Sequence, residues 1–260
     1  MEVSPHAASI GRWRAVAKDR VELARLFLGE RSDPIAFYER LATDTVAHLP
    51  GPVDGLRVLD LGCGPGHYTR ALRAAGARVV PIDLDVDELH LPGGPPGAPV
   101  IADAERLPVP DAAFDAVMCS NMLEHTPSPA SVLDEVARVL KPGGWAWLSW
   151  TNWYSPWGGH DLTPWHYLGA RLGPAAQRRL SGRPLKHEPG RNLFPLHIGQ
   201  FFRLVDAHPR LARIDATPRY WPSQRWILRV PGVREVAAWN CVLVLGRTDS
   251  EIAGYSPRFH

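Results

Sequence analysis

The spacing of hydrophobic residues along the chain follows two different periods, which predict alternating strands and helices. Short apolar runs that end in a polar residue predict buried strands at 57–61, 78–82, 100–102, 114–119, 144–150, 211–217 and 240–246. Apolar residues that recur every three or four positions predict helices at 12–28, 35–49, 68–75, 128–140 and 198–206. This alternation predicts an α/β protein with a seven-stranded, doubly wound parallel sheet and helices on both faces.

The length of the chain suits one domain, because single cores stop growing only beyond roughly 250 to 300 residues. We expect a single domain over 1–260 with five parts. The N-terminal helices span 1–50 and the core spans 55–150. An insertion after strand five spans 151–199, the C-terminal part of the sheet spans 200–248, and a tail spans 249–260. The insertion exceeds the roughly 12 to 15 residues of an ordinary structureless loop, so it is expected to be a lid or binding element.

Composition excludes several function classes. The net charge is only +2, so no global basic field favours nucleic-acid binding. No apolar run approaches the roughly 18 residues of a membrane span, and the first residues lack the apolar stretch of a secretory signal. Cys63, Cys119 and Cys241 form no disulfide pattern and no metal-binding pair. A cytoplasmic protein is expected, and nothing indicates its oligomeric state.

A glycine-rich turn between the first core strand and its helix is the strongest chemical signal. It has the form G-x-G-x-G at Gly62, Gly64 and Gly66, with Asp60 two residues ahead. Glycines let the backbone turn sharply and let a ligand approach the main chain at the carboxyl edge of the sheet. The alternative is a dinucleotide fingerprint, G-x-G-x-x-G, but its third glycine position holds His67.

This turn resembles motif I of the class I S-adenosylmethionine-dependent methyltransferases, of the methyltransferase type 11 kind. Further segments resemble the same family in the same order, namely Asp83 at the end of strand two, Asp103-Ala104 after strand three, 120–125 after strand four and 140–144 before strand five. The resemblance implies a Rossmann-like fold that uses S-adenosylmethionine and releases S-adenosylhomocysteine.

The resemblance also implies where the cofactor lies. Gly62 and Gly64 would face its amino-acid end, and the carbonyl of Asn121 would lie near its amino group. Asp83, rather than Asp85, would accept hydrogen bonds from the ribose. Asp103 and the backbone beside it would meet the adenine. The expected cofactor-binding residues are Asp60, Gly62, Cys63, Gly64, Gly66, Asp83, Leu84, Asp103, Ala104 and Asn121.

The acceptor is expected to be a small molecule, a sugar or a glycolipid. Position 120–123 reads Ser-Asn-Met-Leu in place of the [DNS]-P-P-[YFW] motif of nucleic-acid amine methyltransferases, and no cysteine follows a proline. Aromatic residues and glycines in the insertion could form a wall for an acceptor, or could cap the core. A basic stretch at 171–191 could hold phosphate or carboxylate, or could be a solvated face.

The insertion also resembles uncharacterised actinobacterial methyltransferases linked with cell-envelope glycolipids, while natural-product tailoring enzymes share the core equally. O-methylation in envelope biosynthesis or secondary metabolism is therefore expected. One alternative is a non-catalytic S-adenosylmethionine-binding partner or regulatory protein. Another is a nicotinamide-dependent oxidoreductase, which His67 disfavours.

A hydroxyl acceptor needs a base, and histidine is the obvious candidate because its ordinary pKa lies near 6.5. His160 with Asp161 is the first choice, since the pair follows a Gly-Gly turn after strand five. His125 and His166 are the other expected catalytic residues, and His197 is a further candidate. No metal is expected, although His160, Asp161 and His166 form a conceivable metal set.

Overall fold

The computed structural model describes residues 34–91 and 94–248. The helix expected at 12–28 and the tail at 249–260 lie outside the described residues. The chain separates into two compact units, Met1–Pro52 and Val53–His260. Helix α2 (Pro34–Ala47) belongs to the first unit, and every other described element belongs to the second. The expectation of a single domain stays a prediction.

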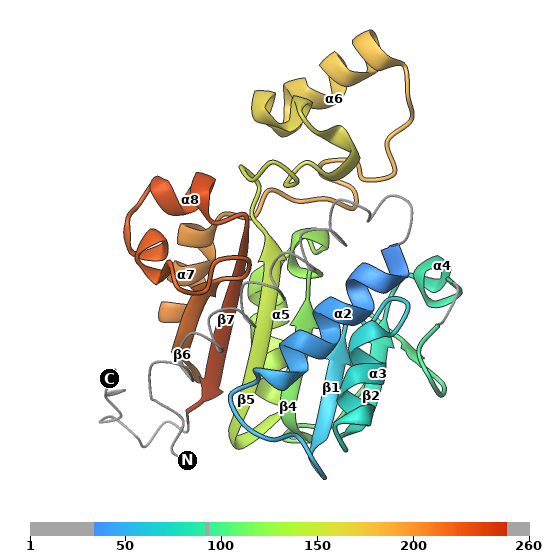
Figure 1. Ribbon diagram of the computed structural model, residues 1–260, viewed down its shortest axis with the longest axis vertical. Helices are drawn as coiled ribbons and strands as arrows, with labels where there is room; N and C mark the ends of the chain where they lie inside the picture. The colour runs from blue at the N-terminus through green and yellow to red at the C-terminus, as the bar shows by residue number, and fades with distance from the viewer. Residues whose placement is uncertain (1–33, 92–93, 249–260) are drawn as a thin grey trace, which may run out of the picture. The chain divides into compact units, whose positions relative to one another are not determined.

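A seven-stranded sheet with the order β3-β2-β1-β4-β5-β7-β6 forms the centre of the second unit (Figure 1). Its strands are β1 (Arg57–Leu61), β2 (Arg78–Asp83), β3 (Val100–Ile101), β4 (Phe114–Ser120), β5 (Leu140–Thr151), β6 (Leu211–Pro218) and β7 (Asn240–Arg247). Neighbouring strands from β3 to β5 are parallel. The seven expected strands and the doubly wound Rossmann-like architecture are confirmed.

Strand β7 corrects the expectation of a wholly parallel sheet, because it runs antiparallel to both β5 and β6. Pro218 at the end of β6 pairs with Cys241 at the start of β7, so the chain turns back beside the strand it has just left. Antiparallel neighbours need no crossover over the face of the sheet. Hydrophobic periodicity does not encode strand direction, which explains the error.

Helices cover both faces of the sheet. In Figure 1, α3 lies in front of the sheet, and α5 and α7 lie behind it. The α-helices of this unit are α3 (His67–Ala74), α4 (Val86–Leu89), α5 (Pro129–Val139), α6 (Gly169–Ser181), α7 (Ile198–Asp206) and α8 (Val233–Ala237). Short 3-10 helices are η1 (Leu123–His125), η2 (His160–Leu162), η3 (Trp165–Leu168) and η4 (Arg225–Arg229). No helix among the described residues is long and apolar enough to cross a membrane.

The main core fills the space between the sheet and helices α5 and α7. Trp150 on β5 is fully buried, and its ring centroid lies 4.7 Å from that of Phe201 on α7. Helix α5 starts where its sequence predicts, because the Ser128 hydroxyl accepts a hydrogen bond from the Ser131 backbone N–H and Pro129 occupies the first turn. This rigid core holds the carboxyl ends of β1, β4 and β5 in fixed positions.

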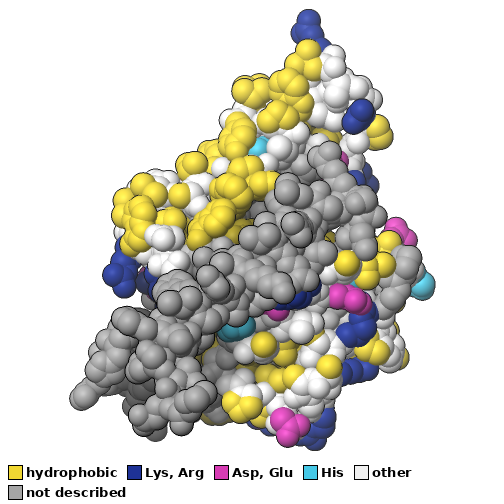
Figure 2. All heavy atoms as spheres, viewed as in Figure 1, with side chains coloured by type: hydrophobic (Ala, Val, Ile, Leu, Met, Phe, Trp, Pro, Cys, Tyr) yellow, Lys and Arg dark blue, Asp and Glu magenta, His cyan; other side chains and the backbone are white. Residues whose placement is uncertain are grey.

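The insertion after β5 has a structure of its own, with η2, η3 and the 13-residue helix α6. A second buried cluster of Trp153, Leu162 and Leu193 holds its base. A Cβ added at Gly159 would lie 2.5 Å from the side chain of His166, so the Gly-Gly turn permits this close packing. Figure 2 shows exposed hydrophobic side chains over α6 and over α8.

Candidate active site

The glycine-rich turn follows β1 and leaves an open side for a ligand. Gly62, Gly64 and Gly66 have φ values of +72°, +46° and +79°, a region that side chains with a Cβ rarely adopt. The backbone N–H of Gly62 donates to the carbonyl of Ile82 on β2, which anchors the turn to the sheet. Among the described residues, no atom outside Gly64 and its two chain neighbours lies within 4 Å of the place that a Cβ at Gly64 would take. A ligand can therefore reach the main chain at Gly64.

Two carboxylates border this turn. Asp60 is 2% exposed, accepts the Thr69 hydroxyl at 2.5 Å, and has its pKa raised by burial to about 7. Asp83 accepts the Gly64 N–H at 2.7 Å, and burial raises its pKa as well. Asp85 instead caps α4, because its side chain accepts N–H groups of that helix. Asp83 rather than Asp85 thus reaches the glycine turn.

The remaining residues expected around the cofactor lie along the same edge. Asp103 follows β3 and accepts the Glu105 N–H at 2.9 Å, and Ala104 packs partly against the core. Leu84, beside Asp83, is exposed. Cys63 is buried within the turn, and desolvation raises the pKa of its thiol.

Asn121, at the end of β4, is the centre of a polar cluster. It has a φ of +54°, and its side-chain oxygen accepts hydrogen bonds from the Asn240 amide at 2.7 Å and from the Arg219 guanidinium at 3.4 Å. Arg219 also donates to the hydroxyls of Ser149 and Tyr68. No sequence signal pointed to Arg219, because it lies 98 residues from Asn121 along the chain and outside any motif.

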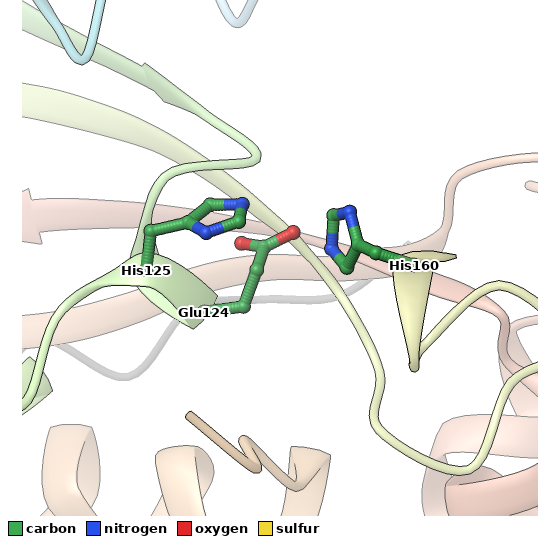
Figure 3. Close-up of side chains that lie close together, drawn as sticks. All are labelled: Glu124, His125 and His160. Atoms are coloured by element: carbon green, nitrogen blue, oxygen red, sulfur yellow. The ribbon is translucent and has the colours of Figure 1, made fainter. Parts of the chain in front are cut away.

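Three histidines meet at the carboxyl ends of β4 and β5. The ring centroids of His125 and His160 are 5.0 Å apart. The ring centroid of His187 lies 4.7 Å from that of His160 and 5.5 Å from that of His125. They come from η1, η2 and the segment after α6. Glu124 lies beside them, is 2% exposed, and accepts the Thr151 N–H at 2.9 Å through one oxygen. Figure 3 shows the carboxylate and two of the rings turned toward one another. We call Glu124, His125, His160 and His187 the histidine cluster.

Further hydrogen bonds orient two rings of the histidine cluster. His125 Nδ1 donates to the carbonyl of Asn192 at 2.7 Å. His187 Nδ1 bonds the carboxylate of Asp161 at 2.8 Å, and that carboxylate also accepts the Lys186 backbone N–H at 2.6 Å. Because each Nδ1 is engaged, the Nε2 atoms of both rings remain to face other partners.

His160 has an unusual environment. Its φ of +49° is rare for a residue with a side chain, and its buried Nε2 has no hydrogen-bond partner among the described residues. Burial, followed by the nearby His125 and His187, lowers the pKa of His160 to about 3. Burial also lowers the pKa of His187. His160 is therefore neutral at neutral pH, and its Nε2 is available to a hydrogen-bond donor or to a cation.

The expected catalytic residues are only partly brought together. His125, His160 and Asp161 lie in or beside the histidine cluster. His166 does not, because its fully buried ring donates to the Ser155 carbonyl at 3.1 Å and contacts Trp153 with a centroid distance of 5.7 Å. The conceivable metal set that included His166 is thus not assembled.

Sequence reasoning missed His187 and the role of Glu124. His187 lies in a charged segment with no periodic pattern, and contacts with residues distant in sequence, including its bonds to Asp161, bring it to the cluster. Glu124 was visible in the 120–125 segment but had an ordinary explanation at the end of a strand. His197, the further candidate, is stacked on Tyr154 with a centroid distance of 5.1 Å.

The glycine turn and the histidine cluster occupy the same edge of the sheet. The place that a Cβ at Gly62 would take lies 2.5 Å from the Met122 side chain, which immediately follows Asn121. Glu124 and His125 come next along the chain. Parallel sheets bind ligands outside the carboxyl ends of their strands, at the point where the strand order reverses. Here that reversal lies between β1 and β4.

Comparisons with known proteins agree with this geometry. Residues 59–148 match a family model described as a methyltransferase domain. An uncharacterized methyltransferase of Mycobacterium ulcerans (strain Agy99) is 37% identical over 245 residues, covering 89% of this chain and 95% of that protein. A counterpart in Mycobacterium tuberculosis (strain ATCC 25618 / H37Rv) is also 37% identical, covering 89% and 96%.

Solved structures show the same fold. An S-adenosylmethionine-dependent methyltransferase from Mesorhizobium loti matches with a TM-score of 0.54 and 20% identity, over 81% of this chain and 98% of that one. The two mycobacterial relatives thus cover 89% of the chain, and the solved structure shares its fold. The chain belongs to the S-adenosylmethionine-dependent methyltransferases with a Rossmann-like fold.

Proposed function

We propose that this methyltransferase transfers a methyl group to a hydroxyl of a small-molecule, sugar or glycolipid acceptor, in actinobacterial secondary metabolism or envelope biosynthesis. The observation that supports this proposal is the histidine cluster, which lies on the same edge of the sheet as the glycine turn. A hydroxyl must lose its proton to become a good nucleophile, whereas a carboxylate or thiolate is already ionised. Several buried proton acceptors at this edge suit a hydroxyl best.

The cofactor's place follows from the residues around the glycine turn. S-adenosylmethionine supplies an electrophilic methyl group, and the protein must hold it in line with the acceptor. The open side of Gly64 suits the amino-acid end, and the carbonyl of Asn121 suits its amino group. The Asp83 carboxylate lies directly beside Gly64 and suits the ribose, which leaves Asp103 for the adenine.

Within the cluster, His160 is the first candidate to act on the acceptor. Its Nε2 is buried and without a hydrogen-bond partner among the described residues, so it is available to an acceptor hydroxyl. His125 lies next to it. Asp161 is a positioning residue, because it holds His187 and the backbone after α6 in place. His166 is assigned a packing role.

The insertion supplies surfaces that suit an apolar or sugar-like acceptor. Tyr154, Trp157 and Tyr167 are 40%, 42% and 51% exposed, so they are available as a wall. Trp153, by contrast, is buried in the insertion's own core. The buried Trp153 fits the capping interpretation, and the exposed rings are proposed as the wall for an acceptor.

Single-turnover methyl transfer with His160→Ala tests this proposal, using a panel of hydroxylated glycolipids and natural-product alcohols. Turnover should fall by about 10²- to 10⁴-fold while cofactor affinity stays unchanged, because loss of proton acceptance slows only the chemical step. His48→Ala is the matched control, since His48 is exposed just after α2 and its Nδ1 bonds the Asp44 carbonyl of that helix. Transfer exclusively to carboxylate or thiol acceptors would refute hydroxyl methylation.

A further inference from the structure

We infer that Glu124, His125 and His160 form a binding site for a divalent transition-metal ion. One nitrogen or carboxylate oxygen from each residue lies within 4.8 Å of the others. Glu124 and His125 lie in η1, which follows β4, and His160 begins η2 in the insertion after β5. This site does not depend on the identity of the acceptor. Its use in catalysis rests on the proposed function.

Two buried atoms in this group lack a partner that the described protein could supply. Glu124 Oε2 and His160 Nε2 are both buried without a hydrogen bond among the described residues. The other carboxylate oxygen of Glu124, Oε1, does have a partner, because it accepts the Thr151 N–H. A carboxylate oxygen and an imidazole lone pair that face the same space are both electron-pair donors. A cation bound between them satisfies both at once, and the geometry of the three side chains favours this partner.

The surrounding hydrogen bonds are those of metal-binding histidines. A metal-binding histidine usually donates its second ring N–H to a carbonyl or carboxylate, which orients the ring and fixes its tautomer. His125 Nδ1 makes this bond to the carbonyl of Asn192, and His187 Nδ1 makes it to Asp161. His125 Nε2 is thereby left to bind the ion. His187 lies beside the three ligands and lines the remaining side of the site.

The donor set indicates the class of metal. Two imidazoles and one carboxylate suit Zn²⁺, Fe²⁺, Co²⁺ or Mn²⁺, whereas Ca²⁺ and Mg²⁺ prefer oxygen donors alone. With bonds of about 2.1 Å, ligand atoms of a tetrahedral ion lie about 3.4 Å apart, so small side-chain rotations would close the site. Three protein ligands leave a fourth position open, as in catalytic zinc sites.

An open position on the ion would give the cluster a second means of activating the acceptor. A hydroxyl oxygen bound to a divalent cation has a lowered pKa, so it ionises more readily at neutral pH. The methyl group of S-adenosylmethionine needs no metal. The ion would act on the acceptor alone, and cofactor affinity would not depend on it.

Cobalt provides a direct test that needs no acceptor. The full-length protein is treated with a chelator and titrated with Co²⁺, whose visible absorption reports coordination by nitrogen and oxygen ligands. One Co²⁺ per chain is expected. Glu124→Gln and His160→Ala should each weaken Co²⁺ binding at least tenfold, and His48→Ala should leave it unchanged. Glu124→Gln retains an oxygen that can accept the Thr151 N–H, so this variant removes the charge without removing the bond.

Binding of S-adenosylhomocysteine shows that each variant is folded. Absence of Co²⁺ binding by the wild-type protein, or equal binding by folded Glu124→Gln and His160→Ala variants, would overturn the inference. Turnover of a hydroxyl acceptor that survives chelation but requires His160 would overturn the use of the ion in catalysis, while leaving the proposed function intact. Co²⁺ bound at this site by a protein that methylates no hydroxyl would support the metal site and refute only the proposed function.

Discussion

Gly64 shows how one residue can be required by a ligand and not by packing. Its φ of +46° strains any side chain, yet a Cβ placed there would meet no atom within 4 Å in the described part of the chain, its two chain neighbours aside. Gly143 has the same two properties, with a φ of +75° and no neighbouring atom. It precedes the central part of β5, at the opposite end of that strand from the active-site edge. The two glycines therefore form a matched pair.

Gly64→Val should abolish binding of S-adenosylmethionine, because the side chain would fill the space that the cofactor needs. The Gly143→Val variant should bind S-adenosylmethionine normally. Both variants carry a similar cost in folding free energy, roughly 1 to 2 kcal/mol, for a side chain in the left-handed region. Isothermal calorimetry on the two folded variants measures the difference. Unchanged affinity in Gly64→Val would mean that the cofactor does not approach this turn.

Asp60 makes the stability of the protein depend on pH. Burial raises its pKa from 3.8 to about 7, so between these values the folded state holds a proton that the unfolded state has released. The carboxylate therefore lowers the free energy of unfolding as pH rises through this window, and the cost is complete above about pH 7. Below pH 3.8 both states are protonated, and the effect vanishes.

Asp60→Asn should remove this dependence, because an amide oxygen can still accept the Thr69 hydroxyl and carries no charge. Each pKa unit corresponds to about 1.36 kcal/mol. Relative to the wild type, the free energy of unfolding of the variant should therefore rise by a few kcal/mol between pH 4.5 and pH 8. Urea denaturation at both pH values checks this gain. A difference that stays constant with pH would show that Asp60 is ionised in the folded protein.

Residues near one another in sequence could be predicted, and contacts between distant residues could not. Asp83 was distinguished from Asp85 because it ends a buried strand, and the structure places it against Gly64. Arg219 and His187 reach the site through contacts that span the sheet and the insertion. No local pattern records such contacts, so the sequence could not indicate these residues.

At the scale of elements, predictions succeeded where burial sets a clear period. Helix α7 begins and ends at the predicted residues, Ile198 and Asp206, because its buried face repeats regularly. Helix α6 was missed because Gly169, Gly173 and Pro174 interrupt its pattern. Helix α6 forms through packing in the insertion, where Gly173 lies against the backbone of Trp165. Tertiary contacts therefore decide this element.

The segment after α6 depends on Asp161 in a testable way. Asp161→Ala should release the Lys186 and His187 backbone and lower turnover by about 10- to 100-fold, the usual effect of losing an orienting carboxylate. Asp161→Asn should restore part of the activity, because one amide oxygen still accepts a backbone N–H. Cofactor affinity should stay constant in both. Equal turnover in wild type and Asp161→Ala would exclude a positioning role.

At the scale of the whole molecule, the sheet order places two chemistries at one edge. The reversal between β1 and β4 lies beside the glycine turn, and the segments that follow β4 and β5 contribute to the histidine cluster at the same edge. The sequence predicted a doubly wound, Rossmann-like sheet, while the strand order and the reversed direction of β7 came only from the structure. Binding at this edge should stabilise the entire fold.

S-adenosylhomocysteine at 100 times its dissociation constant should stabilise the protein by about 2.7 kcal/mol, because it binds only the folded state. For a unit of this size, that corresponds to a rise in Tm of roughly 5 to 11 °C. NAD at equal concentration should produce no shift, since His67 occupies the position of the third fingerprint glycine. A larger shift with NAD would contradict the cofactor assignment.

The bonds from Asp161 to Lys186 and His187 also close a loop of the chain around α6. Lengthening a loop whose ends are already joined costs little, about 0.6 kcal/mol for each doubling. The outer face of α6, where Leu172 and Leu180 are each 67% exposed, can therefore change in sequence or length without displacing His160 or His187. Evolution can vary this segment separately from the chemistry, so related enzymes can diverge in acceptor range while retaining the same catalytic edge.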